Sequence, residues 1–240
     1  MNALTLIAIS LLSGAIAGTF LGIVNQGIVE PYIERAIEIE MQNASANGEM
    51  INPIEFSSYR LWQKGGEVAA GTILGMSMGA LFGIVFAYSH GSLPGSSAKR
   101  RALILTGVLW LVLYLLPAIK YPANPPAVGD PETIYYRQSL YLAFLAISGF
   151  GALGLAVLYG RLKSRVKKVA VPLVYAGIMA GAFLLLPPNP DEITAPLDLV
   201  LGFRLASGLT MTAFWVLLGI MSGFFWDKFR LHETATAKLQ

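Results

Sequence analysis

Cysteine is absent from the 240-residue chain, and histidine occurs only at His90 and His232. A chain without cysteine has no disulfide framework, no thiolate metal site and no cysteine nucleophile. The two histidines lie on separate segments, whereas imidazole-rich metal sites need several ligands that converge. The sequence therefore offers few of the soft or borderline side chains that usually hold transition metals.

Charge is also scarce, because Asp, Glu, Lys and Arg make up only 13% of the residues, about half the share of a soluble domain. Hydrophobic residues make up 55%, and the mean hydropathy is +0.61. Six apolar runs are long enough, or nearly so, to cross the ~30 Å hydrocarbon core of a bilayer; they lie at about 3–26, 67–88, 102–119, 139–159, 169–186 and 203–226. We predict an all-α polytopic membrane bundle of about six transmembrane helices in three hairpins, in which residues 1–240 form a single integral membrane domain in contact with lipid.

Catalytic signatures are missing as well. No Asp, Glu, Lys or His falls in the middle third of any apolar run, where secondary transporters normally keep an ionisable group or a broken helix. Walker-type and His-Glu-x-x-His motifs do not occur. These absences argue against a stand-alone enzyme or an ATP-driven pump, so we expect no enzymatic activity and no resident cofactor.

The few charges that are present predict an orientation. Segments 89–101, 160–169 and 227–240 carry eleven Lys or Arg and two acids, whereas segments 27–67, 120–138 and 187–204 carry six Lys or Arg and twelve acids. Lys- and Arg-rich loops stay in the cytoplasm. We therefore expect both termini inside, the acidic loops outside and an acidic extracytoplasmic segment at 27–66. The net charge of +3 then reflects cytoplasmic loops, and we expect no nucleic-acid partner.

Glycine recurs at every fourth residue in the first two apolar runs. The positions are Gly14, Gly18 and Gly22 in the first run and Gly71, Gly75, Gly79 and Gly83 in the second. This spacing places the glycines on one face of each helix and lets a neighbouring backbone approach closely. We interpret the pattern first as tight helix–helix packing, with a glycine-lined permeation path as the alternative.

Proline concentrates in two of the expected outer segments. Residues 117–137 contain five prolines, and a similar stretch follows at 186–198. Because proline lacks the backbone N–H and clashes with the preceding turn, we expect that no helix runs through these stretches and that they form ordered caps or loops. Asn124 and Asp191 belong to Asn-Pro turns whose oxygens could face an ion, although capping of helix ends is the usual role of such turns.

A short acidic helix is predicted directly after the first apolar run. Glu30, Glu34 and Glu38 are four residues apart and stack on one helical face, and Pro31 suits a first turn. Carboxylate oxygens are the ligands of hard divalent cations. Together with Asn124 and Asp191, these glutamates are candidate metal ligands; the alternative is a solvated acidic face.

Three arginines lie near the expected outer interface, at Arg60, Arg137 and Arg204. Arginines in such places usually pair with carboxylates. Glu30, Glu67 and Asp198 are candidate partners. We interpret these arginines first as structural clamps between hairpins and second as ligand-facing groups.

Four stretches of the chain resemble the CbtA family, predicted cobalt transporter subunits of prokaryotes. They are the glycine-rich first helix with Val29-Glu30-Pro31-Tyr32-Ile33-Glu34, Arg60-x-x-Gln63, residues 116–126 (Leu-Pro-Ala-Ile-Lys-Tyr-Pro-Ala-Asn-Pro-Pro) followed by Arg137, and residues 190–196 (Pro-Asp-Glu-Ile-Thr-Ala-Pro) followed by Phe203-Arg204-x-x-Ser207. The resemblance spans nearly the whole chain, and Tyr-Pro-Ala-Asn-Pro-Pro is its most specific part.

The resemblance implies a subunit in the prokaryotic cytoplasmic membrane that takes up Co²⁺ for cobalamin synthesis. It also implies a small single-span partner, CbtB, with a histidine-rich end, which fits the scarcity of histidine in this chain. Two hypotheses stay open. Either the outer carboxylates and Asn/Pro carbonyls admit a divalent ion, or the chain is a non-transporting accessory subunit that docks a larger membrane complex through its outer loops.

Overall fold

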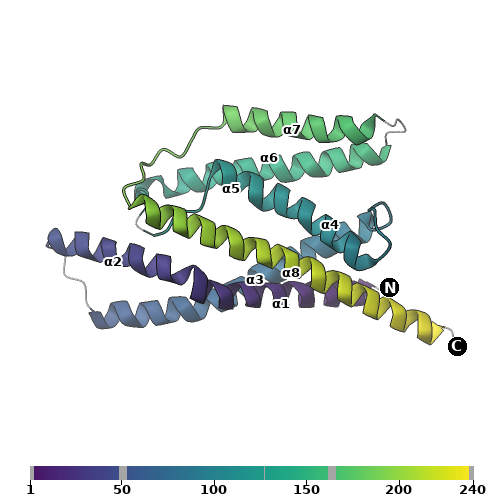
Figure 1. The fold of residues 1–240 in the computed structure, drawn as a ribbon, viewed down its shortest axis with the longest axis horizontal. Helices are drawn as coiled ribbons and strands as arrows, with labels where there is room; N and C mark the ends of the chain where they lie inside the picture. Colours follow the sequence, from purple (N-terminus) through teal and green to yellow (C-terminus); the bar gives the residue numbers. More distant parts are fainter. Residues whose placement is uncertain (1–2, 49–52, 127, 162–165, 238–240) are drawn as a thin grey trace. The chain divides into compact units, whose positions relative to one another are not determined.

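A computed structural model describes residues 3–48, 53–126, 128–161 and 166–237. The gaps fall within the expected acidic segment 27–66, the loop 120–138, the basic loop 160–169 and the two ends. The helices are α1 Ala3–Ile28, α2 Glu30–Ala46, α3 Pro53–Ser89, α4 Ala98–Trp110, η1 Leu111–Leu115, α5 Leu116–Lys120, η2 Pro131–Thr133, α6 Ile134–Arg161, α7 Lys167–Leu185 and α8 Leu197–Ala237 (Figure 1).

Six helical stretches are long and apolar enough to cross a membrane, and no strand occurs in the ranges described. The stretches are Ala3–Ile28, Ile54–Ser89, Ala98–Lys120, Pro131–Arg161, Lys168–Leu185 and Leu197–Phe229. The prediction of an all-α, multi-pass membrane protein with six spanning helices is therefore confirmed.

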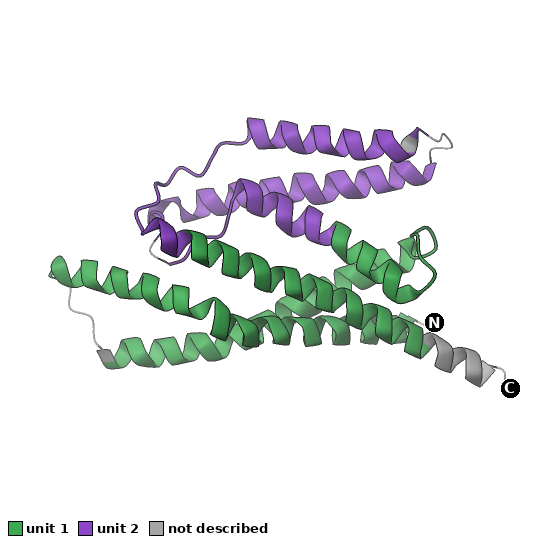
Figure 2. Cartoon of the chain, in the orientation of Figure 1, with its two compact units in different colours: residues 1–108, 201–240 green, residues 109–200 purple. Residues whose placement is uncertain are grey.

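The helices group into two compact units (Figure 2). Unit 1 consists of residues 1–108 and 201–240, and therefore holds α1, α2, α3 and most of α4 and α8. Unit 2 consists of residues 109–200 and holds η1, α5, η2, α6 and α7.

In unit 1, α1 and α3 approach backbone to backbone through their glycines. A Cβ atom placed on Gly22 would lie 2.7 Å from the Cα of Val68, and one on Gly71 would lie 2.7 Å from the carbonyl oxygen of Gly18. Cβ atoms on Gly14 and Gly75 would likewise meet the backbone of the facing helix. The glycine spacing thus removes the side chains that would otherwise hold these two helices apart.

The helix α3 begins at Pro53, fourteen residues before the apolar run at 67–88. Residues 53–66 are too polar for the hydropathy pattern to include them, yet they continue the same helix through Gly65. Pro53 fits a first turn, and Glu55 in that turn complements the helix dipole. Part of the segment expected as an outer loop is therefore a helical extension beside α2.

The helix α8 contacts three other helices of unit 1. Near its start, Phe203 and Ala206 pack with Val29 at the α1–α2 junction. Further along, Gly219 lies against Thr106 of α4. Near its end, the ring of Trp226 meets that of Phe86 on α3 edge-on, with centroids 4.8 Å apart.

Unit 2 contains a widened helical turn before Pro117. The segment Leu111–Leu115 is a π-helix, as expected where proline cannot donate to the preceding turn and clashes with it. The hydroxyl of Ser148 on α6 donates to the carbonyl oxygen of Val112 in this turn at 2.6 Å. That hydroxyl also lies 2.7 Å from the hydroxyl of Tyr175 on α7, so one buried serine joins three helical segments.

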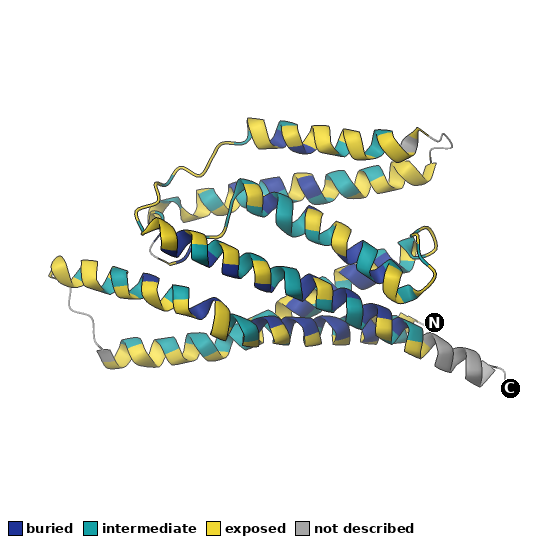
Figure 3. Cartoon of the chain, in the orientation of Figure 1, coloured by how far each residue is buried: buried dark blue, intermediate teal, exposed yellow. Residues whose placement is uncertain are grey.

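Buried residues concentrate along the inner faces of the unit 1 helices, whereas α6 and α7 show mostly exposed positions (Figure 3). The core of unit 2 is a small cluster of Phe144, Met179 and Ala182. Exposed apolar side chains such as Leu184 and Leu185 are normal for helices surrounded by lipid.

Candidate functional site

The most charged part of unit 1 lies where α2 runs beside the first turns of α3. We call Glu30, Glu34, Arg60 and Lys64 the Glu30 cluster. Arg60 is ion-paired to Glu30, and Lys64 is ion-paired to Glu34. The Nζ atom of Lys64 also lies 3.5 Å from Oε1 of Glu30, so the lysine bridges both carboxylates.

The spacing of these residues explains why they meet. Glu30 and Glu34 are one turn apart on α2, and Arg60 and Lys64 are one turn apart on α3, so each pair presents its charges on one helical face. Gln63 accepts a hydrogen bond from Nη1 of Arg60 at 2.7 Å. The result is two opposed rows of charge that hold α2 against α3.

Burial differs strongly within the cluster. The side chain of Glu30 is 8% exposed, that of Lys64 is 38% exposed and that of Glu34 is 50% exposed. A carboxylate as buried as Glu30 needs cationic partners to remain charged, and Arg60 supplies one. Glu34 is the accessible end of the cluster.

The hydrogen bond from Lys64 lowers the pKa of Glu34 below its ordinary value of 4.5, against a smaller opposing effect of burial. Glu34 is therefore a carboxylate at neutral pH. Glu67, one turn beyond Gln63 on α3, hydrogen-bonds to the Asn25 side chain and adds a further negative charge near Glu30. Counting Glu30 itself, three acids and two bases thus lie close together here.

The remaining candidate metal ligands lie elsewhere. Glu38 is exposed on α2, one turn beyond Glu34. Asn124 and Asp191 belong to the proline-rich segments of unit 2, where Asn124 interacts with neighbouring groups. Within the ranges that the structure describes, no three His, Asp or Glu side chains gather closely enough to hold a metal ion.

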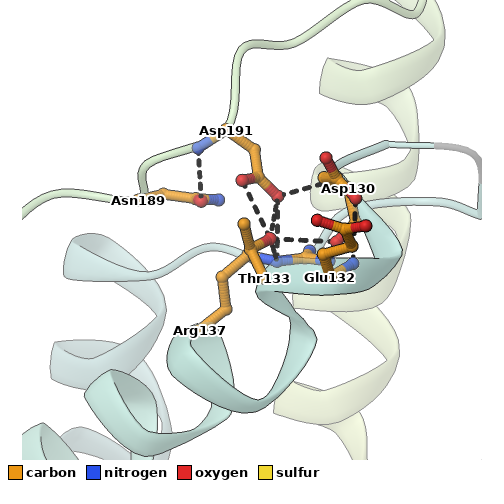
Figure 4. A network of polar contacts seen from close by, with 6 residues as sticks. All are labelled: Asp130, Glu132, Thr133, Arg137, Asn189 and Asp191. Atoms are coloured by element: carbon orange, nitrogen blue, oxygen red, sulfur yellow. Dashed lines mark hydrogen bonds and ion pairs between the residues drawn. The ribbon is translucent and has the colours of Figure 1, made fainter.

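Asp191 is the centre of a polar network that joins the two proline-rich segments of unit 2 (Figure 4). Its Oδ2 atom lies 2.9 Å from Nε of Arg137 and accepts a hydrogen bond of 2.9 Å from the backbone N–H of Asp130. The hydroxyl of Thr133 donates to the same carboxylate at 2.8 Å. Asn189 caps the turn by accepting from the N–H of Asp191 at 3.1 Å.

This network needs glycine at position 129. Gly129 has φ +100°, in the region that favours glycine, and a Cβ atom there would crowd both Asp191 and Arg137. The side chain of Asp191 is 7% exposed and that of Arg137 is 23% exposed. Several donors therefore satisfy a nearly buried carboxylate, which favours a clamp between loops over an open ligand for an ion.

The candidate arginines thus have different surroundings. Arg60 pairs with Glu30, one of the acids considered for it, whereas Arg137 pairs with Asp191, which the sequence pattern placed among the metal ligands. Asp198 and Arg204 lie in the first turns of α8, and each interacts with neighbouring groups. The sequence pattern did not identify Lys64 or Thr133 as site residues. A signal for Lys64 was present, because it follows Arg60 by four residues, the same spacing as between Glu30 and Glu34.

The family model of a probable cobalt transporter subunit, CbtA, matches residues 4–227. No protein of curated function and no solved structure matches the chain. The matched range covers all six candidate spans except one residue at the start of the first and two at the end of the last, and it includes the Glu30 cluster and the Asp191 network. The chain therefore belongs to the CbtA family of probable cobalt transporter subunits.

Proposed function

We propose that this chain is the membrane-spanning subunit of a Co²⁺ uptake system in the prokaryotic plasma membrane. In this proposal its acidic segments face outward, it acts with a small single-span partner, and the cobalt serves cobalamin synthesis. The observation that supports the proposal most directly is the family match over residues 4–227. The Glu30 cluster is the part of unit 1 best suited to receive a divalent cation.

The cluster offers hard oxygen ligands whose charge is balanced by an exchangeable base. Glu34 is half exposed, Glu38 follows it on the same face, and Lys64 bridges Glu34 and Glu30. A divalent cation that approached this face would compete with the ammonium group of Lys64, which is itself only partly buried. Arg60 would keep Glu30 paired during the exchange. Lys64 thus acts as a placeholder, a positive charge that occupies the position beside the carboxylates which the ion would take.

The ligand set of this cluster is weak for a transition metal, because carboxylate and water favour hard ions, and imidazole holds Co²⁺ better. A partner with histidines near the outer end of α2 would supply what this chain lacks. We therefore assign transient collection of the ion to Glu34 and Glu38 and tighter binding to the partner. Asp191 has no part in this collection step, since it is engaged by Arg137.

Uptake of Co²⁺ into proteoliposomes tests the proposal. We expect flux when the chain is reconstituted together with its single-span partner, and a strong reduction in the double variant Glu34→Gln/Glu38→Gln. Glu192→Gln, an exposed acid of unit 2, is the matched control and should leave flux unchanged. Flux that does not respond to loss of both α2 carboxylates would remove their role in collection.

Titration calorimetry tests the placeholder role of Lys64. Lys64→Gln frees Glu34 and should make Co²⁺ binding to the detergent-solubilised chain several-fold tighter. Lys120→Gln is the control, because Lys120 lies in unit 2 and donates to the carbonyl oxygen of Phe183 at 2.8 Å. An unchanged affinity in Lys64→Gln would show that the ion does not compete with the lysine.

An accessory role is the second candidate function, favoured by exposed aromatic groups on the first turns of α3. Tyr59 is 56% exposed, Leu61 75% and Trp62 73%, and the rings of Tyr59 and Trp62 stack with centroids 6.4 Å apart. Such a surface suits docking of another membrane protein. Absence of flux in every reconstitution, combined with loss of complex formation in Trp62→Ala, would establish this role instead.

A further inference from the structure

Positive charge is concentrated at the end of unit 1 where α4 begins and α8 approaches its last turns. Segments 89–101 and 227–240 hold six Lys or Arg against two acids, a net charge of +4. Within three residues of the apolar runs of these two helices lie four of the bases: Lys99, Arg100, Arg101 and Lys228. Side chains of this kind near helix ends extend their charged groups to the membrane interface, so these bases are at the level of lipid headgroups.

The packing of α4 on α8 brings these bases together. A Cβ atom on Gly223 of α8 would lie 3.0 Å from the backbone nitrogen of Lys99, and one on Gly219 would meet the side chain of Thr106. The two helices therefore run antiparallel in close contact (Figure 1). Lys228 follows Gly223 by five residues, about 7.5 Å along the axis of α8. Bases from two helices thus share one end of unit 1.

These bases lack acidic partners within the part of the chain that the structure describes. Lys99, Arg100 and Lys228, which we call the Lys99 cluster, are exposed and form no ion pair there. The first turn of α4 contains no acid, and the dipole of that helix adds to the positive charge at this end. Asp227 is the one acid of the two segments whose side chain is described. The charge of the cluster is therefore not offset by the fold, and an anion from outside the chain would be attracted to it.

An exposed apolar surface leads along α8 to the Lys99 cluster. Leu209, Val216 and Phe224, which we call the apolar strip, are all exposed, and intervals of seven and eight residues place them on one side of the helix. Lys228 follows Phe224 by about one turn, and its Nζ atom lies 5.9 Å from the centroid of the Phe224 ring. A free anion would use only the bases, whereas a lipid with a charged head and acyl chains would use both surfaces.

We propose that the Lys99 cluster binds the phosphate of an anionic phospholipid, with an acyl chain of the same lipid along the apolar strip. Arg100 supplies the planar donor fork that suits phosphate, and the two lysines supply point charges. Arg101 takes no part, because its Nε atom donates to the carbonyl oxygen of Gly95 at 3.0 Å. In the orientation that the charges predict, the lipid belongs to the cytoplasmic leaflet, whose anionic lipids attract such bases. Lipid binding here does not depend on cobalt transport.

Native mass spectrometry of the detergent-solubilised chain tests the proposal, with phosphatidylglycerol as the anionic probe and phosphatidylcholine as the zwitterionic reference. We expect the natural chain to bind phosphatidylglycerol at least about tenfold more tightly. Each base near an anionic headgroup contributes about fivefold to such binding. The triple variant Lys99→Gln/Arg100→Gln/Lys228→Gln should therefore lose most of the preference.

A control variant separates this site from general attraction by interfacial charge. Arg161→Gln/Lys168→Gln removes two exposed bases beside the spanning helices of unit 2 and should keep the preference for phosphatidylglycerol. Equal binding of both lipids to the natural chain would overturn the proposal without reference to any variant. A loss of preference in the control as large as that in the triple variant would overturn it as well.

Two further measurements address folding and the nature of the ligand. In phosphatidylcholine nanodiscs the triple variant should have the Tm of the natural chain, because the three side chains are exposed; in phosphatidylglycerol nanodiscs only the natural chain should gain in Tm. Glycerol phosphate carries the anionic group without acyl chains and should not displace phosphatidylglycerol at comparable concentration. Displacement by glycerol phosphate would show a site for free anions and would refute lipid as the ligand.

Discussion

Arg137 and Asp191 are joined by an ion pair of 2.9 Å between Nε and Oδ2, across 54 residues of sequence. Both belong to unit 2, and their contact closes the two proline-rich segments on each other (Figure 4). Because proline limits the backbone on either side, a few side-chain bonds are enough to order both loops.

Loss of this pair should destabilise unit 2. Asp191→Asn leaves Arg137 without its charge partner, and we expect a cost of about 2–4 kcal/mol, somewhat below the value for full burial because Arg137 is 23% exposed. The Tm of the detergent-solubilised protein should fall, and proteolysis within 186–196 should accelerate. Glu192→Gln is the control; equal behaviour of the two variants would show that the pair does not hold the loops.

The Glu34–Lys64 pair should make stability depend on pH. The folded-state pKa of Glu34 lies below 4.5 because of the hydrogen bond from Lys64, so the pair stabilises the fold above that value. Its contribution is lost as the pH falls through the lowered pKa. Between about pH 5 and pH 3, the Tm of the natural chain should therefore fall more steeply than that of Glu34→Gln.

Glu38→Gln serves as the comparison in this titration, since Glu38 is an exposed acid on the same helix. It should follow the natural chain. If Glu34→Gln and the natural chain gave parallel curves, the ion pair would contribute nothing measurable, as many exposed pairs do.

The glycine contact between α1 and α3 should tolerate no added methyl group. Gly75→Ala places a Cβ atom against the backbone of Gly14 and Gly18, and the forced separation should cost about 1–3 kcal/mol. Gly177→Ala on α7 is the matched control, because nothing lies within 4 Å of a Cβ there. It should be neutral or stabilising by up to ~1 kcal/mol through helix propensity; similar Tm values for both variants would contradict the contact.

Ser148 should be required for the widened turn before Pro117. Ser148→Ala leaves the carbonyl oxygen of Val112 without the hydroxyl that donates to it at 2.6 Å, at a cost of about 1–3 kcal/mol in a buried site. Ser139→Ala, an exposed serine bonded only within its own helix, should cost little. A Tm for Ser148→Ala equal to that of Ser139→Ala would mean that the turn does not depend on this bond.

Much of the fold could be predicted from the composition and from the spacing of apolar residues and glycines along the chain. Apolar runs of about twenty residues predict spanning helices, and glycine at every fourth position predicts the side on which α1 and α3 approach. Hydropathy cannot detect the part of a helix that lies outside the bilayer, so the apolar pattern did not indicate that α3 begins at Pro53. The π-helix at Leu111–Leu115 could have been suspected from Pro117, whose missing N–H disturbs the turn before it.

The polar sites were harder to predict, because the partner of a carboxylate depends on which side chains the fold brings close to it. The spacing of Glu30 and Glu34 indicates a shared face, but only the fold shows that Arg60 and Lys64 oppose it. Asp191 is a carboxylate of the kind that coordinates ions, but in the fold Arg137 and Thr133 engage it, so it holds two loops together.

The length of α3 has a mechanical consequence. Its 37 residues extend about 55 Å, some 25 Å more than the hydrocarbon core, without a break between the Glu30 cluster and the glycine contact with α1. An unbroken helix of this length moves as one body, so a tilt at one end of α3 is carried to its other end. Any displacement of α2 relative to α3, such as exchange of Lys64 for an ion, would swing the buried half of α3 together with α1, so the two helices would respond as one rigid pair.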